Sequence, residues 1–248
     1  MCQCTYIVYW HIFYMIMAHY KNIFFDLDDT LWHFSENAED SFREVFFKHG
    51  LNHYFDSFEQ FYSIYQKRNK ELWVEYGNGD ITKEELNRQR FSYPLRTVGV
   101  DDEALAKKYS DDFFAIIPLK SKLLPGAKEV LDYLSSGGYR LFILSNGFRE
   151  LQFQKMKSAG IDGYFKKVIL SEDIHVHKPY PEIFNFALSA TQSRLQDSLM
   201  VGDSWEADIE GAKGVGMHQM YFNYLKRSDL PFKPTYKIDA LTEILALL

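Results

Sequence analysis

Cysteine is almost absent from this chain of 248 residues, in which Cys2 and Cys4 are the only two. They lie one residue apart, a spacing that matches no zinc-binding pattern and provides no disulfide framework. The rest of the chain lacks cysteine, which is consistent with a reducing compartment. We therefore expect a cytoplasmic protein.

Runs of basic residues are also missing. Lys and Arg total 28 against 34 Asp and Glu, so the formal net charge is -6. This balance disfavours a nucleic acid polymer as a main partner, although local positive charge could still bind an anionic substrate. Internal repeats and low-complexity segments are absent too. A hydrophobic content of 46% supports a packed core rather than disorder.

The chain has no apolar run long enough for an ordinary transmembrane helix, which needs about 20 apolar residues. Residues 5–17 are strongly apolar but too short, and they lack the basic flank and cleavage site of a signal peptide. Because Met17 would make a natural start, we interpret residues 1–16 as a non-core N-terminal extension. A membrane-associating segment is the alternative, but no membrane partner is expected.

What the sequence does contain is a short apolar run that ends in carboxylates. Ile23, Phe24 and Phe25 suit a strand buried on both faces, and the acidic run Asp26-Leu-Asp28-Asp29 follows at once. Carboxylates crowded at the end of a buried strand repel one another, and a cation such as Mg2+ would relieve that repulsion. An acidic turn is the alternative interpretation, and this stretch alone does not decide between them.

The pattern after Thr30 is helical for about ninety positions. Ser35 is expected to cap a first helix, Asp56 or Ser57 a second, and Thr82, three residues before Glu85, a third. A fourth helix is expected from about residue 102 to 117. We interpret the aromatic stripes on these helices as helix–helix packing.

From Pro125-Gly126 onward, strands and helices alternate. Strands are expected at 139–144, 167–170, 198–202 and 217–222, and helices at 126–136, 149–159, 181–190, 205–213 and 240–247. This alternation predicts an α/β fold with a doubly wound, Rossmann-like parallel sheet. The predicted domains are a core of residues 17–33 and 120–248 and an inserted all-helical cap of residues 34–119.

Open parallel sheets bind ligands at the carboxyl ends of their strands. Four of the five predicted strands are followed by polar residues. They are Asp26 to Thr30 after the first strand, Ser145-Asn146-Gly147 after 139–144, Ser171 to Lys178-Pro179 after 167–170, and Asp203 to Asp208 after 198–202.

These four stretches resemble, in order and separation, the four motifs of the haloacid dehalogenase-like hydrolase superfamily. The resemblance covers nearly everything from Met17 onward. It implies an aspartyl-phosphate mechanism with Mg2+ as cofactor. Asp26 would be the nucleophile and Asp28 the general acid and base.

The resemblance also implies the remaining roles. Mg2+ would be held by Asp26, the backbone carbonyl of Asp28 and Asp203, with Asp208 in support. Ser145 and the backbone N–H of Asn146 would hold phosphate oxygens, together with Lys178, which supplies a fixed positive charge. Thr30 is predicted to orient the acidic loop and to belong to the phosphate-binding set.

Several of these residues also have purely structural interpretations. Thr30 could be only a turn hydroxyl, Ser145 a helix cap, Lys178 a solvated surface lysine, and Asp208 a complement to a helix dipole. The family motif gives His175 and His177 no role, and we interpret both as loop histidines.

A carboxylate at Asp28 favours phosphoryl transfer over dehalogenation, because a halide leaving group needs no proton. Phosphonate hydrolysis would need a lysine on the cap, and Lys67, Lys70 and Lys83 are candidates that nothing singles out. The stretch 76–86, with Arg90-Phe91 beyond it, and the stretches 145–150 and 171–174 are similar to bacterial pyrimidine 5′-nucleotidases. That similarity predicts hydrolysis of nucleoside monophosphates such as UMP and dTMP.

Other functions stay open at this point. They are a phosphatase of another metabolite such as a sugar phosphate or phosphoglycolate, a phosphomutase, and, more remotely, a catalytically silent binding protein or a membrane-tethered phosphatase. Trp32, Phe34, Trp73 and Tyr76 could stack a base, although most are expected to be cap core. The expected partner is a small phosphomonoester, and the expected assembly is a monomer or homodimer.

Overall fold

The computed structural model describes residues 20–248, so the predicted extension of residues 1–16 lies outside the described part of the chain. The chain forms two compact units. The core unit comprises the described residues up to Leu31, Pro125–Asn146 and Tyr164–Leu248, and the helical unit comprises Trp32–Leu124 and Gly147–Gly163. Within residues 20–248, none of the helices combines the length and apolar character needed to cross a membrane.

The core unit contains a six-stranded sheet in the order β3-β2-β1-β4-β5-β6, and all of its strand pairs are parallel. This arrangement confirms the predicted α/β class. The strands are β1 (Asn22–Phe25), β2 (Arg140–Ser145), β3 (Phe165–Leu170), β4 (Ser198–Gly202), β5 (His218–Phe222) and β6 (Tyr236–Ile238).

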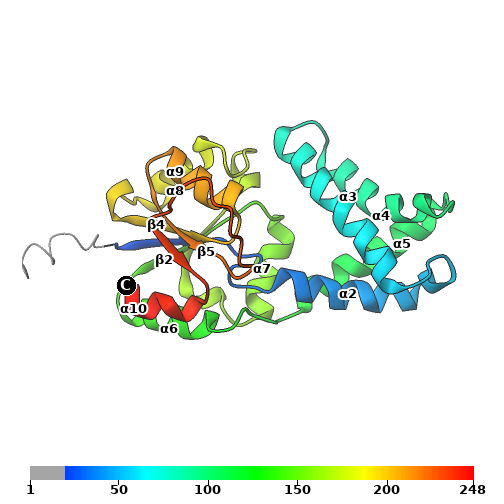
Figure 1. Ribbon diagram of the computed structural model, residues 1–248, viewed down its shortest axis with the longest axis horizontal. Coiled ribbons are helices and arrows are strands. Elements are labelled where there is room, and N and C mark those ends of the chain that lie inside the picture. The colour runs from blue at the N-terminus through cyan, green and yellow to red at the C-terminus, as the bar shows by residue number, and fades with distance from the viewer. Residues whose placement is uncertain (1–19) are drawn as a thin grey trace, which may run out of the picture. The chain divides into compact units, whose positions relative to one another are not determined.

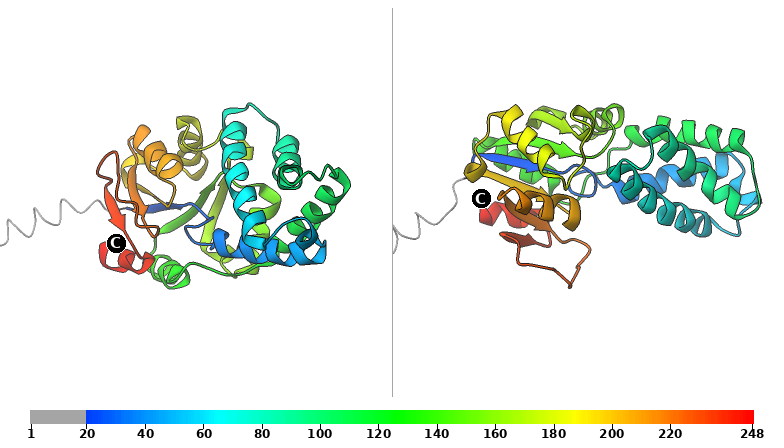
Figure 2. Two further views of the ribbon diagram at one scale, coloured as in Figure 1. Left: turned by 45° about the vertical axis from the view of Figure 1, so that its right-hand side comes forward. Right: turned by 90° about the horizontal axis from the view of Figure 1, so that it is seen from above.

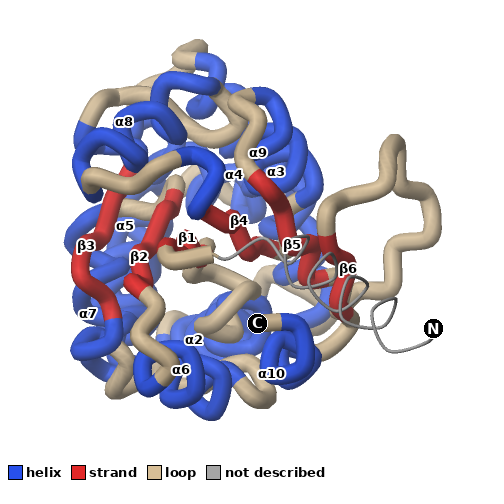
Figure 3. The backbone as a smooth tube through the Cα atoms, turned by 90° about the vertical axis from the view of Figure 1, so that its left-hand side faces the viewer, coloured by secondary structure: helices blue, strands red, loops and turns tan. Residues whose placement is uncertain are grey.

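Helices cover both faces of this sheet, with α8 and α9 on one side and α6 and α10 on the other (Figures 1 and 3). Their bounds are α6 (Ala127–Ser136), α8 (Pro181–Thr191), α9 (Gly211–Gly214) and α10 (Ile244–Leu247). Side chains alternate between the faces of a strand. Accordingly, Phe24 and Phe142 pack with Ile183 and Phe184 of α8 in one fully buried cluster. Burial on both faces explains why the strand residues read as continuous apolar runs.

The helical unit is built around aromatic side chains. Phe42 and Phe113 stack with ring centroids 4.1 Å apart, and Phe61, Tyr65 and Phe91 surround Phe42. These contacts confirm that the aromatic stripes serve helix packing. Figure 2 shows the helices of this unit as ribbons. The helices are α2 (Phe34–Lys48), α3 (Phe58–Asn78), α4 (Lys83–Thr97), α5 (Glu103–Ile116) and α7 (Arg149–Ser158).

Local capping determines where three of these helices begin. The side chains of Ser57, Thr82 and Asp102 accept hydrogen bonds from backbone N–H groups in the first turns of α3, α4 and α5. The expected cap at Ser35 was wrong, because α2 already begins at Phe34 and its N-cap, His33, makes no side-chain capping bond.

Two features of the core unit lie outside the sequence-based expectations. The segment Trp205–Glu210 forms a π-helical turn before α9, where a regular helix was expected. The short strand β6 adds an edge to the sheet beside β5. The assignment of the helical unit as a cap stays a prediction.

Candidate active site

Asp26 stands directly after β1, at the carboxyl end of a central strand. Its backbone N–H continues the strand pairing by donating to the carbonyl oxygen of Val201 in β4, at 2.9 Å. Asp203 follows β4. In the sheet, β2 and β3 lie on one side of β1, and β4, β5 and β6 lie on the other. The two carboxylates therefore lie where the strand order reverses, which is the usual ligand position in such sheets.

Lys178 is buried in this site. The residue is only 5% exposed, and its Nζ donates to Asp26 Oδ1 at 2.7 Å, Asp208 Oδ1 at 2.6 Å and the carbonyl oxygen of Leu144 at 2.8 Å. An ammonium group has three donors, and all three have partners here. The interpretation of Lys178 as a solvated surface lysine is therefore excluded.

Burial and charge shift the pKa values of this cluster in opposite ways. Burial opposes the charged form of Lys178, but Asp208 and Asp26 outweigh it and raise the pKa of the ammonium group. Burial raises the pKa of Asp26 to about 7, although Lys178 opposes the shift. Desolvation likewise raises the pKa values of Asp203 and Asp208. The site contains more buried negative charge than one lysine compensates.

Thr30 contacts Asp203 rather than standing as a turn hydroxyl. The side chain is fully buried. Its Oγ1 donates to Asp203 Oδ1 at 2.9 Å and accepts from the backbone N–H of Asp203 at 3.1 Å. A hydroxyl can donate one hydrogen bond and also accept. These two hydrogen bonds tie the loop after β1 to the end of β4. The predicted contact of Thr30 with phosphate stays a prediction.

Asp208 sits in the π-helical turn and is fully buried. Its Oδ1 accepts from Lys178, and its Oδ2 accepts from the backbone N–H of Ser204 at 3.1 Å. Gly202 makes room for this carboxylate, since a Cβ there would lie 2.2 Å from Asp208 Oδ2. These contacts exclude the interpretation of Asp208 as only a complement to a helix dipole.

The three aspartates Asp26, Asp203 and Asp208 form a group that could hold a metal ion. One carboxylate oxygen from each lies within 4.8 Å of the others. Carboxylate oxygens are the ligands that Mg2+ prefers, and a cation would offset the excess negative charge. This oxygen donor set fits the predicted cofactor. Asp28 lies two residues beyond Asp26, is half-buried, and raises the pKa of Asp26 by its charge.

Ser145 and Asn146 lie at the carboxyl end of β2, beside β1. Ser145 is the last residue of the strand, and α7 begins only at Arg149, so Ser145 is not its helix cap. The Asn146 side chain makes two hydrogen bonds with the backbone of Lys178. Its Nδ2 donates to the Lys178 carbonyl oxygen at 3.0 Å, and its Oδ1 accepts from the Lys178 N–H at 2.8 Å. This side-chain function of Asn146 was not predicted.

Both histidines beside the lysine fit the interpretation of loop residues. His175 has a positive φ of 55°. Burial lowers the pKa of His177, although Glu172 opposes the shift. Neither belongs to the carboxylate group described above.

The aromatic residues considered for base stacking are mostly packed within the helical unit. Trp32 is fully buried, and its Nε1 donates to the carbonyl of Lys120. Trp73 and Tyr76 pack against Phe148, with ring centroids 5.3 and 6.0 Å apart.

Of the three lysines considered for a Schiff base, one is paired and two are exposed. Lys83 Nζ pairs with Glu150 at 2.8 Å and lies over the Phe148 ring. Lys67 and Lys70 are exposed on α3.

The profile of the haloacid dehalogenase-like hydrolases matches residues 20–216. The chain belongs to this family. It is 38% identical over 209 residues to a glyceraldehyde 3-phosphate phosphatase of Pyrococcus abyssi, covering 83% of this chain and 82% of that protein. It is 32% identical over 234 residues to the pyrimidine 5′-nucleotidase YjjG of Escherichia coli, covering 91% and 96%.

A solved structure of the same family agrees over nearly the whole fold. The HAD-hydrolase YfnB of Bacillus subtilis, bound to magnesium, superposes with a TM-score of 0.82 at 26% identity and covers 93% of this chain and 99% of that one. The predicted superfamily, its fold and the similarity to pyrimidine 5′-nucleotidases are therefore confirmed. The names of these haloacid dehalogenase-like relatives support the prediction of a phosphatase.

Two contributors to this candidate site are not among the predicted residues. The carbonyl of Leu144 accepts from Lys178, and Gly202 admits the Asp208 carboxylate. A backbone carbonyl leaves no mark in a sequence. Gly202 is the last residue of the apolar strand β4, and a glycine within a strand is a recognisable sign of close approach by another group.

Proposed function

We propose that the protein is a Mg2+-dependent phosphomonoester hydrolase that acts through an aspartyl-phosphate on Asp26. The observation that carries this proposal is the buried contact of Lys178 Nζ with both Asp26 and Asp208, next to Asp203. Carboxylates this close, at the end of parallel strands and joined by a lysine, suit binding and transfer of an anionic group.

In this proposal Asp26 attacks the phosphorus of the substrate, and the phosphoryl group passes to its carboxylate. Asp28 protonates the departing oxygen and then removes a proton from the water that hydrolyses the aspartyl-phosphate. Lys178 places a fixed positive charge beside Asp26 Oδ1. Asn146 holds the backbone of Lys178 through two hydrogen bonds, so that its ammonium group stays in place during turnover.

Phosphate binding in the proposal involves Ser145 and the backbone N–H of Asn146, with Lys178 as the charged partner. Asp26, Asp203 and Asp208, with the Asp28 carbonyl, would hold Mg2+. When bound, the ion screens the phosphate from the carboxylates and stabilises developing negative charge. Thr30 orients Asp203 through its two hydrogen bonds.

Two substrate classes are supported by relatives of this chain. Nucleoside 5′-monophosphates are favoured by the similarity to pyrimidine 5′-nucleotidases over the stretches 76–86, 90–91, 145–150 and 171–174. A small sugar phosphate is favoured by the glyceraldehyde 3-phosphate phosphatase, whose identity to this chain is higher over a shorter stretch. The proposal therefore includes both substrate classes.

Phosphate release from a panel of monophosphates separates these classes. The panel contains UMP, dUMP, dTMP, CMP, AMP, glyceraldehyde 3-phosphate, glucose 6-phosphate and phosphoglycolate, each assayed with Mg2+ and with EDTA. A preference for UMP, dUMP or dTMP supports the nucleotidase, and a preference for a three-carbon or sugar phosphate supports the alternative. Failure to hydrolyse any of them with Mg2+ would contradict the proposal and favour a phosphomutase or a silent binding protein.

A further inference from the structure

The loop of residues 223–235 connects β5 to β6 within the core unit. It packs on the π-helical turn Trp205–Glu210, which carries Asp208. Leu230 and Phe232 of the loop lie against a buried apolar cluster that the turn forms with β5. A segment outside the predicted site residues is therefore in contact with the element that positions one of them.

Phe232 contacts the turn through Trp205. The centroids of the two rings are 4.6 Å apart. The Lys213 Nζ lies 3.4 Å from the Phe232 centroid, in a cation–π contact that helps to hold the ring. Trp205 is only 1% exposed and also packs against Tyr221 of β5, with centroids 5.1 Å apart. Its Nε1 donates to Glu210 Oε1 at 2.9 Å. Trp205 is thus held by a strand, by the loop and by its own turn.

Polar contacts also connect the loop to the turn. The Asn223 Oδ1 accepts from the backbone N–H of Arg227 at 2.8 Å, and the Asn223 Nδ2 donates to the Arg227 carbonyl oxygen at 3.0 Å. The Arg227 Nη1 donates to Glu206 Oε1 in the turn at 3.0 Å. Both members of this ion pair are exposed, and exposed pairs contribute little. The packing of Phe232 is therefore the stronger link between the loop and the turn.

The turn joins this apolar packing to the candidate active site. Two of its residues, Trp205 and Ile209, belong to the apolar cluster. Asp208 lies between them in the sequence and belongs instead to the carboxylate group, with one oxygen within 4.8 Å of oxygens of Asp26 and Asp203. Because the turn is only six residues long, a movement of its apolar side also moves the carboxylate.

We propose that Phe232 is a positioning residue of the candidate active site. Through Trp205 it holds the π-helical turn in the conformation that keeps Asp208 beside the other carboxylates, and it thereby sets the affinity for Mg2+. The inference rests on the Mg2+ site of the proposed function. Residues that orient metal ligands from outside the site affect metal affinity strongly, although they contribute no ligand atom.

Titration calorimetry of the metal-free, full-length protein with Mg2+ measures this effect without any substrate. We expect Phe232→Ala to raise the dissociation constant for Mg2+ by about fivefold or more, because loss of an orienting residue typically weakens metal binding by about 10–100-fold. Phe232→Tyr should bind Mg2+ as the wild type does, since it keeps a ring against Trp205. A role limited to stability would leave the dissociation constant unchanged in both variants.

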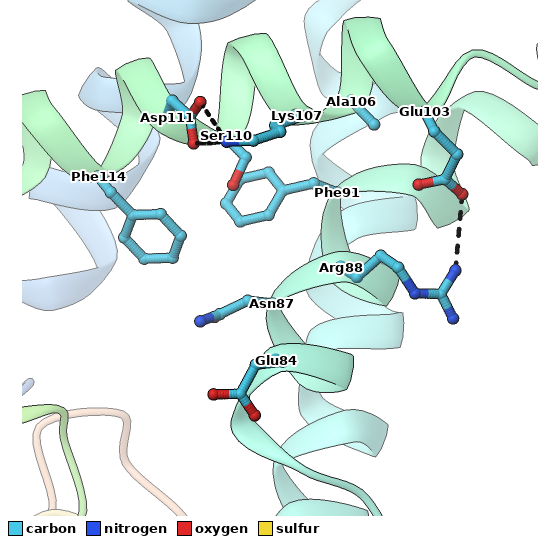
Figure 4. A pocket seen from close by; sticks show the side chains of 10 residues that line it. All are labelled: Glu84, Asn87, Arg88, Phe91, Glu103, Ala106, Lys107, Ser110, Asp111 and Phe114. Atoms are coloured by element: carbon cyan, nitrogen blue, oxygen red, sulfur yellow. Dashed lines mark hydrogen bonds and ion pairs between the residues drawn. The ribbon is translucent and has the colours of Figure 1, made fainter.

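Phe114→Ala is the matched control. Phe114 is also a half-buried phenylalanine, but its ring packs against Phe91 and Phe113 in the helical unit. There it lines a cavity of about 570 Å3 between α4 and α5 (Figure 4). Because distant sites act independently, we expect this variant to change the dissociation constant for Mg2+ by less than about twofold.

A folded Phe232→Ala protein that binds Mg2+ as tightly as the wild type would overturn the proposal, as would an equal loss of affinity in Phe114→Ala. Circular dichroism checks the fold of each variant. If Phe232→Ala does not fold, Phe232→Leu replaces it: leucine stays apolar but lacks the ring, so Mg2+ binding should still weaken, by about twofold or more. Wild-type affinity in folded Phe232→Leu would then overturn the proposal.

The titration also separates this inference from the proposed function. A wild type that binds Mg2+ but hydrolyses no monophosphate contradicts the proposed phosphatase alone, and the role of Phe232 is still decided by its variants. A wild type that binds no Mg2+ contradicts both.

Discussion

Lys178 carries the positive charge that joins two buried carboxylates of the candidate active site. Its Nζ contacts Asp26 and Asp208, and all three side chains are almost completely shielded from solvent. Removing one member of such a group leaves buried charge without compensation, which typically lowers stability by about 3–5 kcal/mol. The lysine is therefore expected to matter for folding as well as for catalysis.

We predict that Lys178→Met lowers the free energy of unfolding by several kcal/mol and abolishes turnover. The double variant Lys178→Met/Asp208→Asn should regain part of the stability, because one of the two carboxylates loses its charge, but none of the activity. Urea denaturation in EDTA measures the effect. Lys237→Met is the control: Lys237 pairs with Asp239 at the surface, so we expect a change of less than about 1 kcal/mol. A Lys178→Met protein as stable as the wild type would contradict this account.

The raised pKa of Asp26 predicts a pH dependence of the metal-free protein. Its ordinary value is 3.8 and its folded value about 7, so the folded state holds a proton that the unfolded state releases between these values. The stability from this group is complete below pH 4 and is lost as pH rises through 7. In EDTA, the free energy of unfolding should therefore fall between pH 5 and pH 8.

Two comparisons isolate this effect. Asp26→Asn should show a smaller fall over the same range, because an amide does not titrate. Adding Mg2+ to the wild type at pH 8 should restore stability, because a bound cation compensates the carboxylates. A metal-free wild type whose stability rises from pH 5 to pH 8 would show that burial does not govern the ionisation of Asp26.

Among the secondary-structure elements, the π-helical turn Trp205–Glu210 has the most direct effect on the site. It places Asp208 against β4, where the carboxylate reaches both Lys178 and the Ser204 N–H. Such turns often occur at functional sites. Trp205 anchors this one, since it is buried against Tyr221 and its Nε1 donates to Glu210 Oε1 at 2.9 Å.

Gly202→Ala should displace the Asp208 carboxylate, because the new Cβ would lie 2.2 Å from Oδ2. We predict a loss of at least tenfold in kcat/KM and a higher Mg2+ concentration for half-maximal activity. Gly214→Ala is the matched control, since a Cβ at Gly214 meets nothing within 4 Å. It should leave activity unchanged and raise stability by up to about 1 kcal/mol. Unchanged kinetics in Gly202→Ala would show that the close approach is unimportant.

The elements themselves were largely predictable, and the misses have physical causes. Thr82 and Glu85 marked the start of α4 because a capping residue is a local signal. The three-residue strand β6 was missed because so short a segment shows no periodicity. The π-helical turn was read as a regular helix, since the extra residue per turn depends on contacts such as those of Trp205 rather than on local preference.

For the molecule as a whole, the alternation of strands and helices and the order of the four motifs predicted the fold and the meeting of Asp26, Lys178 and Asp203. The grouping of residues 147–163 with the helices could not be read from the sequence. It depends on long-range packing, in which Phe148 joins Leu72 and Leu86 in one buried cluster. The roles of Asp28, Ser145 and the metal, and the predicted assembly as a monomer or homodimer, stay predictions.

The central claim is that Asp26 is the nucleophile of a Mg2+-dependent phosphatase. Its most direct test is phosphate release by the wild type and Asp26→Asn, on the best substrate of the panel, with and without Mg2+. We predict turnover only for the wild type with Mg2+, and a folded Asp26→Asn protein by circular dichroism. An Asp26→Asn protein that releases phosphate at the wild-type rate, or a wild type equally active in EDTA, would contradict the account.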